Sequence, residues 1–145
     1  MNTNRETGTA TAACYCIKVR KANGTVTKFY DKIMAPSGVT VRQYSLLLHI
    51  SRTEGVSVRQ LADLAGLDRS TLARSLKPLF HKDLIRDAKP TGTRDSRLQL
   101  TEGGRAVLSE AALLWREAQG RFAEAFGPEG LQKLEDVLQT LASLI

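Results

Sequence analysis

Residues 56–101 read VSVRQLADLAGLDRSTLARSLKPLFHKDLIRDAKPTGTRDSRLQLT, a pattern of two short amphipathic helices followed by a hairpin with a basic tip. Ser57 is a suitable N-cap for the first helix, and Gly66 is a suitable stop. Asp68 caps the second helix, which is predicted to run to about Lys82. This order of elements predicts a winged helix-turn-helix, a module that reads duplex DNA.

The second helix has two opposed faces at the helical spacing of about 100° per residue. Its apolar face carries Leu72, Leu76 and Leu79, and its opposite face carries Ser70, Arg74, Lys77 and His81, flanked by Arg69 and Thr71. We expect Arg74 to bind a guanine edge through both guanidinium arms. Ser70 and Thr71 are predicted to contact bases or phosphates, and Arg69 and Lys77 to contact phosphates. A solvated basic face is the alternative interpretation.

The hairpin that follows is predicted to be a wing. The chain runs through the polar segment 87–96 and returns as Arg97-Leu98-Gln99-Leu100, in which the leucines alternate as they do in strands. Pro90 and Gly92 favour a turn, and Arg94 at the tip is placed to enter a minor groove. Arg97 is a further candidate phosphate contact. The alternative is a surface hairpin whose charge has no function.

The rest of the chain predicts further helices at about 12–35 and 42–53, a long helix from 101 towards 126, and a last helix after Pro128. The last helix carries an apolar seam at Leu131, Leu134, Leu138, Leu141 and Ile145. This seam could pack within one subunit or against a partner subunit; a two-fold protein, which must place two recognition helices one DNA turn apart, needs the partner. In the long helix the expected core residues are Val107, Leu108, Ala111, Leu114, Trp115 and Phe122.

The predicted fold class is mainly α with a small β wing. The 145 residues suffice for one domain, and 42% hydrophobic with 25% charged residues is ordinary for a globular protein. The net charge of +6 favours a polyanionic partner. No segment has the apolar character of a secretion signal or a membrane span, so we expect a cytoplasmic protein without a membrane partner.

Three segments resemble the MarR family, the multiple-antibiotic-resistance type of regulators. They are residues 38–47 (GVTVRQYSLL), 67–74 (LDRSTLAR) and 94–104 (RDSRLQLTEGG), and the resemblance extends over nearly the whole chain. It implies a homodimeric, sequence-specific DNA-binding transcriptional regulator that acts as a repressor. Two residues depart from the family pattern: Gly92 stands where an aspartate usually precedes Arg94, and Asp83 stands where glycine is favoured.

The resemblance also implies a domain plan and an effector. Residues 1–145 form one MarR-type domain, with dimerisation helices at about 12–40 and 105–145 and a DNA-binding region at about 41–101. A small aromatic or phenolic effector is expected between the dimerisation helices and the winged helix. Arg20 is the candidate for binding its anionic group and Tyr44 for a pocket wall, although Arg20 is equally compatible with a solvated helix residue.

The two cysteines suggest a second kind of regulation. Because residues i and i+2 point to nearly opposite sides of a helix, Cys14 and Cys16 are not expected to pair with each other, and a disulfide would join subunits. Cys16 and Tyr30 resemble the reactive cysteine and one tyrosine of the organic-hydroperoxide-sensing branch of the family, whereas Arg20 replaces its second tyrosine. A thiol-based redox sensor is therefore the alternative to ordinary half-buried cysteines.

Other function classes find little in the sequence. It contains no Gly-rich phosphate loop, GxSxG or HExxH motif, so we expect neither an enzyme nor a cofactor. His49 and His81 fall on different predicted helices, which gives no pattern for a metal site. A winged helix that docks proteins instead of DNA is the alternative from a different class.

Overall fold

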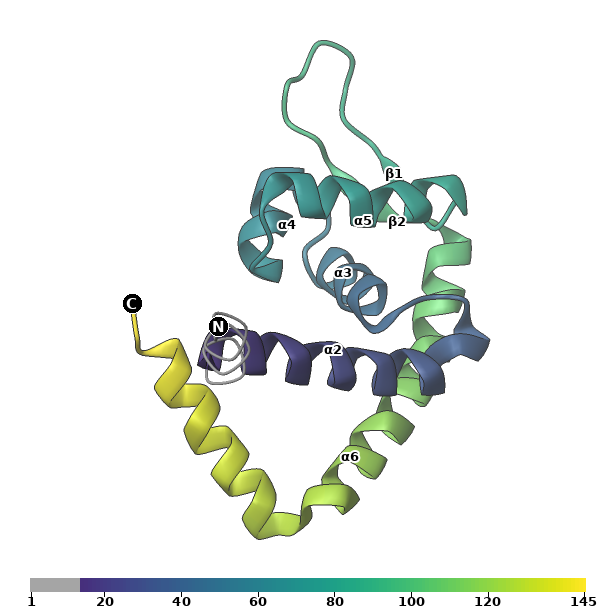
Figure 1. Ribbon diagram of the computed structural model, residues 1–145. Coiled ribbons are helices and arrows are strands. Elements are labelled where there is room, and N and C mark those ends of the chain that lie inside the picture. The colour runs from purple at the N-terminus through teal and green to yellow at the C-terminus, as the bar shows by residue number, and fades with distance from the viewer. Residues whose placement is uncertain (1–13) are drawn as a thin grey trace, which may run out of the picture.

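The computed structural model describes residues 14–145 as a mainly helical fold with one two-stranded wing (Figure 1). Its elements are α2 (Tyr15–Met34), the short 3-10 helix η1 (Ala35–Ser37), α3 (Val41–Arg52), α4 (Val58–Ala65), α5 (Arg69–His81), β1 (Ile85–Asp87), β2 (Leu98–Leu100) and α6 (Glu102–Ala142). The predicted fold class is confirmed. The start of the first predicted helix, at residues 12 and 13, lies outside the described residues. Across residues 14–145, no helix is both long and apolar enough to cross a bilayer.

Side-chain caps set the boundaries of the helices before the wing. At the start of α4, Ser57 Oγ accepts a hydrogen bond from the backbone N–H of Gln60 at 3.1 Å, and Gln60 Oε1 accepts one from the Ser57 N–H at 3.0 Å. Thr40 and Gln43 form the same reciprocal pair at the start of α3. Helix α4 ends at Gly66, whose φ of 64° is a left-handed conformation that glycine adopts without strain. The predicted cap and stop of this helix are confirmed.

Helix α3 lies at the centre of the hydrophobic core. Its Leu46, Leu47 and Ile50 are at most 1% exposed. Figure 1 shows α3 between α2 on one side and the layer of α4, α5 and the wing on the other. Buried side chains reach the same core from the other elements, among them Leu61, Leu72, Leu79, Ile85, Leu98 and Ala111. The apolar face predicted for α5 is therefore the face that anchors it to the core.

The wing projects from the body as a long loop on a short ribbon (Figure 1). Strands β1 and β2 pair antiparallel, and Asp87 Oδ1 accepts a hydrogen bond from the backbone N–H of Arg97 at 2.9 Å beyond the last pair. Ser96 Oγ accepts a hydrogen bond from the Val58 N–H at 2.7 Å, which ties the wing to the start of α4. Gly92 has a φ of 86° at the tip, in agreement with the predicted turn.

A tight junction joins the end of α5, the wing and the start of α6. Asp83 has a φ of 56° and is the one non-glycine residue with a positive φ among residues 14–145. Its carbonyl oxygen accepts a hydrogen bond from Thr101 Oγ1 at 2.6 Å, while the Leu84 carbonyl accepts one from the Thr101 N–H at 3.0 Å. Glycine adopts this left-handed conformation without strain, whereas an aspartate adopts it only at some cost in free energy.

Helix α6 consists of two parts. Its helical run of 41 residues is interrupted at Gly127, where φ is 69° and ψ is 168°, directly before Pro128. The predicted separation of a long helix from a last helix is confirmed at this break, and Figure 1 shows the two parts meeting in a V. In the first part, Val107, Leu108, Ala111, Leu114 and Trp115 belong to or pack against the core, as expected. Phe122 instead stands in an aromatic cluster with Phe29, Tyr30 and Phe126.

Large apolar side chains are exposed near both ends of the described chain. On the last part of α6, Leu138 is 48% exposed and Leu141 is 39% exposed. At the start of α2, Tyr15 and Val19 are also exposed. Packing within one subunit therefore leaves the outer part of the predicted seam open to solvent.

The junction before α6 generates a prediction about two neighbouring glycines. A Cβ on Gly104 would lie 1.9 Å from the Leu84 carbonyl oxygen, whereas a Cβ on Gly103 would meet nothing closer than 3.7 Å. We expect Gly104→Ala to lower the free energy of unfolding by at least about 2 kcal/mol, because backbone must move to admit the methyl group. Gly103→Ala should be neutral or stabilising by about 0.5–1 kcal/mol. Urea unfolding of both variants tests this, and equal stabilities would contradict the close packing.

Candidate nucleic-acid interface

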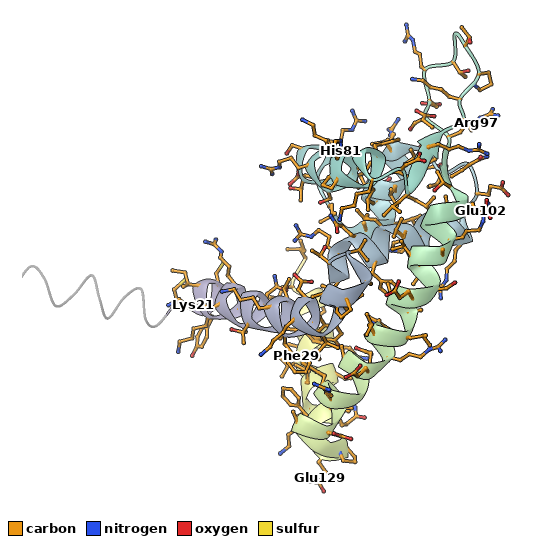
Figure 2. All side chains as sticks on the ribbon, turned by 90° about the vertical axis from the view of Figure 1, so that its right-hand side faces the viewer. Lys21, Phe29, His81, Arg97, Glu102 and Glu129 are labelled. Carbon is orange, nitrogen blue, oxygen red and sulfur yellow. The ribbon has the colours of Figure 1, made fainter. Side chains whose placement is uncertain are left out.

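Helix α5 presents a polar face away from the core. Leu72 and Leu79 are fully buried and Leu76 nearly so, while Ser70, Arg74, Lys77 and His81 are exposed, as the periodicity predicted. In Figure 2, His81 marks the end of this helix, and side chains with nitrogen tips extend from it away from the core. The buried leucines therefore hold a cationic surface outward in one orientation.

A hydrogen-bond network covers the first turn of α5. The Asp68 carboxylate accepts hydrogen bonds from the Thr71 backbone N–H at 2.7 Å, from Ser70 Oγ at 2.8 Å and from Thr71 Oγ1 at 3.0 Å. Arg74 Nη2 donates to Thr71 Oγ1 at 3.5 Å. Ser70, Thr71 and Arg74, all predicted to contact DNA, are thus linked through Asp68, which the sequence indicated only as a cap.

This network lowers the pKa of the exposed Asp68 carboxyl to about 2. The main cause is the hydrogen bond from the Thr71 backbone N–H, followed by those from the Ser70 and Thr71 hydroxyls and by the charge of Arg74. The carboxylate form is therefore the one that the folded helix stabilises.

The remaining predicted cations are exposed and lie on α5 and the wing. They are Arg69 and Lys77 on α5, and Arg94 and Arg97 on the wing. Figure 2 shows Arg97 near the base of the wing, at the same end of the molecule as α5. Among residues 14–145 the one side-chain ion pair joins Arg121 to Glu117, far along α6. The cations of α5 and the wing thus have no carboxylate within ion-pair distance in the described chain.

The structure adds a cation that the sequence interpretation missed. A cleft of about 350 Å³ between α4 and the wing is lined by Arg59 and Arg97, together with Thr93 and Asp95. Arg59 is the second residue of α4, two residues after the cap at Ser57. Because the Ser96 bond to Val58 brings the wing against this helix start, Arg59 extends the cationic surface between them. A basic residue beside a predicted N-cap was the signal that could have identified it.

A second cleft lies between α5 and α2. It measures about 410 Å³ and is lined by residues of α2, α3 and α5, including Asp31, Arg42, Gln43, Thr71 and Arg74. Asp31 Oδ1 accepts a hydrogen bond from the Val41 N–H at 2.8 Å and so ties α2 to the start of α3. Two guanidinium groups and several hydroxyl groups give this cleft the chemistry to bind an organic anion.

The predicted effector residues lie outside that cleft. Tyr44 is buried and stacks on Trp115, with ring centroids 5.9 Å apart. Arg20 is exposed on α2. Within the described chain, neither residue lines the cleft that contains Arg42 and Arg74. Their assignment to an effector stays a prediction.

The predicted redox residues are not brought together within one chain. Cys16 is exposed in the first turn of α2, and both cysteines are free. Tyr30 lies near the other end of the same helix, about 20 Å along the axis from Cys16 at the helical rise per residue. The hydroxyl of Tyr30 donates to Gln119 Oε1 on α6. Redox sensing by Cys16 also stays a prediction.

Comparisons with known proteins give consistent results. Residues 37–91 match the MarR family. The HTH-type transcriptional regulator SarZ of Staphylococcus aureus is 30% identical over 88 residues, and this match spans 60% of each chain. The transcriptional regulator MosR of M. tuberculosis, solved in complex with DNA, is 31% identical with a TM-score of 0.74 over 90% of this chain and 97% of its own. The transcriptional repressor CouR, solved on a 23-mer DNA duplex, is 26% identical with a TM-score of 0.77 over 90% of this chain and 94% of its own.

The Asp68 network predicts how the stability of the protein changes in acid. Because the pKa of Asp68 is lower in the folded than in the unfolded state, its stabilising contribution is present above about pH 4 and is lost as the pH falls towards 2. The free energy of unfolding of the parent should therefore drop more steeply over this window than that of Asp68→Asn, whose side chain does not titrate. An NMR titration of the Asp68 carboxyl should have its midpoint near 2, and a midpoint near 4 would contradict the network.

Proposed function

The chain belongs to the MarR family, and on that premise we propose that it is a sequence-specific transcriptional regulator that reads duplex DNA with α5 and the wing. The observation that carries the proposal is the cationic face of α5, held outward by buried leucines beside a wing that carries Arg94 and Arg97. Arginine and lysine side chains without carboxylate partners are suited to phosphates and base edges.

Each basic element has a distinct part in this proposal. Helix α5 enters the major groove, where Arg74 binds a guanine edge through both guanidinium arms. The wing follows the backbone to the adjacent minor groove, where Arg94 meets the negative potential of a narrow A·T stretch. Arg59 and Arg97, on the two sides of the cleft between α4 and the wing, contact the phosphates that lie between the grooves. MosR and CouR, both solved in complex with DNA, support DNA binding by similarity.

The protein acts as a homodimer in this proposal. The exposed apolar residues at the start of α2 and those on the last part of α6 are side chains that a second copy would bury. Charge favours the same pairing, because α2 carries five basic residues and one acidic residue, Asp31, whereas the last part of α6 carries three acidic residues and one basic residue, Lys133. Two copies joined there would present two recognition helices to successive turns of DNA.

We assign the cleft between α2, α3 and α5 to a small effector anion, with an aromatic or phenolic acid as the ligand class. Its volume of about 410 Å³ lies in the range of small-molecule sites. Arg74 lines this cleft and also belongs to the DNA-facing surface, so a bound carboxylate would compete with DNA for the same guanidinium group. Such competition releases DNA, which is the behaviour of a repressor relieved by its ligand.

The test of DNA reading separates the two basic elements. After selection of a preferred duplex, Arg74→Ala should weaken binding to it by about 1–3 kcal/mol and relax the base preference at one position. Arg94→Ala should weaken binding mainly on duplexes with A·T flanks. Arg116→Ala is the matched control, because Arg116 is exposed on α6 outside this surface. Unchanged DNA affinity in both test variants would favour a protein-docking winged helix.

The dimer is tested through the exposed seam. Leu138→Glu or Leu141→Glu places a charge on the surface that the second copy would bury, so we expect a shift to monomers and weaker operator binding. Gln139→Glu adds a charge to the same helix at an exposed polar position and should leave the dimer intact. Analytical ultracentrifugation measures both. The homodimer would be refuted if the parent protein were monomeric and still bound its preferred duplex with full affinity.

A further inference from the structure

The first turn of the DNA-facing helix carries a carboxylate at a place where DNA phosphates would approach. Asp68 is exposed, yet both of its oxygens are engaged: Oδ1 accepts hydrogen bonds from the Thr71 N–H and from Ser70 Oγ, and Oδ2 accepts one from Thr71 Oγ1. A cap of the helix needs only the first of these bonds. The two bonds from hydroxyl groups require a further explanation.

These two bonds fix the polarity of the hydroxyl groups. An ionised carboxylate only accepts hydrogen bonds, so Ser70 and Thr71 must each direct their single hydroxyl hydrogen at Asp68. Only the lone pairs of each hydroxyl oxygen then point away from Asp68. On Thr71 Oγ1 one lone pair faces Arg74 Nη2 at 3.5 Å, which leaves one for an external donor. Towards DNA, both hydroxyls are therefore acceptors only.

In the major groove, an acceptor can pair only with an amino group. Adenine and cytosine present such groups at N6 and N4, whereas guanine O6 and N7 and thymine O4 are acceptors themselves. Phosphate oxygens are likewise acceptors, and the Asp68 charge repels them. The Thr71 N–H at the helix start is also occupied by Asp68, so it is not free to bind a phosphate.

We propose that Asp68 is a specificity-determining positioning residue, which makes Ser70 and Thr71 read the amino groups of adenine or cytosine and reject the keto edges of guanine and thymine. The inference rests on the proposed function, because it needs α5 in the major groove. The pKa of Asp68, lowered to about 2 by the same hydrogen bonds, keeps the carboxylate ionised at any pH at which the protein binds DNA. Arg74 then supplies a hydrogen-bond donor to the bases and Thr71 supplies an acceptor. The two residues lie about one turn apart on the same face of α5.

Asp68→Asn tests the polarity while it preserves the cap. The cap requires the amide oxygen to face the Thr71 N–H, which places the amide nitrogen where Oδ2 now accepts from Thr71 Oγ1. The nitrogen donates to Oγ1, so the Thr71 hydroxyl hydrogen is released and can donate to a keto oxygen. Asp63→Asn is the matched control: it removes one negative charge from an exposed position of the neighbouring helix α4.

The experiment measures binding ratios on duplexes that differ at one base pair. The base pair read by each hydroxyl is found first: it is the position at which Thr71→Val or Ser70→Ala no longer distinguishes one base pair from another. Circular dichroism checks that both variants keep their helicity. At the base pair read by Thr71, adenine is replaced by guanine, or cytosine by thymine. This exchange should lower the DNA affinity of the parent and of Asp63→Asn by about fivefold or more. For Asp68→Asn the loss should be about twofold or less.

The outcomes separate this inference from the proposed function. The inference would be overturned if Asp68→Asn showed the same ratio of affinities for the amino-base and keto-base duplexes as the parent. It would also be overturned if the parent selected a defined duplex but neither Thr71→Val nor Ser70→Ala changed any such ratio. A parent protein that selects no duplex at all would instead refute DNA reading itself.

Discussion

The burial of the α5 leucines in the core that α3 shares is the interaction on which the exposed cationic face of α5 depends. Leu72, Leu76 and Leu79 belong to the same buried core cluster as Leu47 and Ile50. Each fully buried leucine contributes about 1.5–3 kcal/mol by removal of apolar surface from water. Because a helix is rigid, burying one face of α5 also fixes the direction of the opposite face. The polar face therefore stays exposed without further contacts.

Much of this fold was predictable from sequence, because its boundaries depend on local chemistry. The capping residues Ser57 and Asp68 and the stop at Gly66 act within one helical turn of themselves, and the leucine spacing of α5 reports which side is buried. The junction at Asp83 was not predictable in this way. Its left-handed backbone and the contact of Leu84 with Gly104 arise only when α5, the wing and α6 are packed together.

The candidate site likewise has features that the sequence predicts and features that only the folded structure shows. The exposure of Arg69, Arg74 and Lys77 followed from periodicity, whereas the direction of the hydrogen bonds around Asp68 depends on side-chain rotamers that a pattern of residue types does not specify. Arg59 joins the surface only because Ser96 holds the wing against α4. The lining of the cleft by Arg42 likewise requires the spatial approach of α3 and α5, which are separated by a whole helix in sequence.

The contact between Gly104 and Leu84 also gives the molecule a mechanical property. With no side chain between them, the first turn of α6 packs directly on the backbone of Leu84, between the end of α5 and β1, so a rotation of α6 at this point would carry that segment with it. The first part of α6, up to the break at Gly127, is a lever arm of roughly 37 Å, and a tilt of about 5° moves one end by about 3 Å relative to the other. An angular change of that size at the break would therefore displace the junction with the wing by about the spacing between neighbouring base pairs.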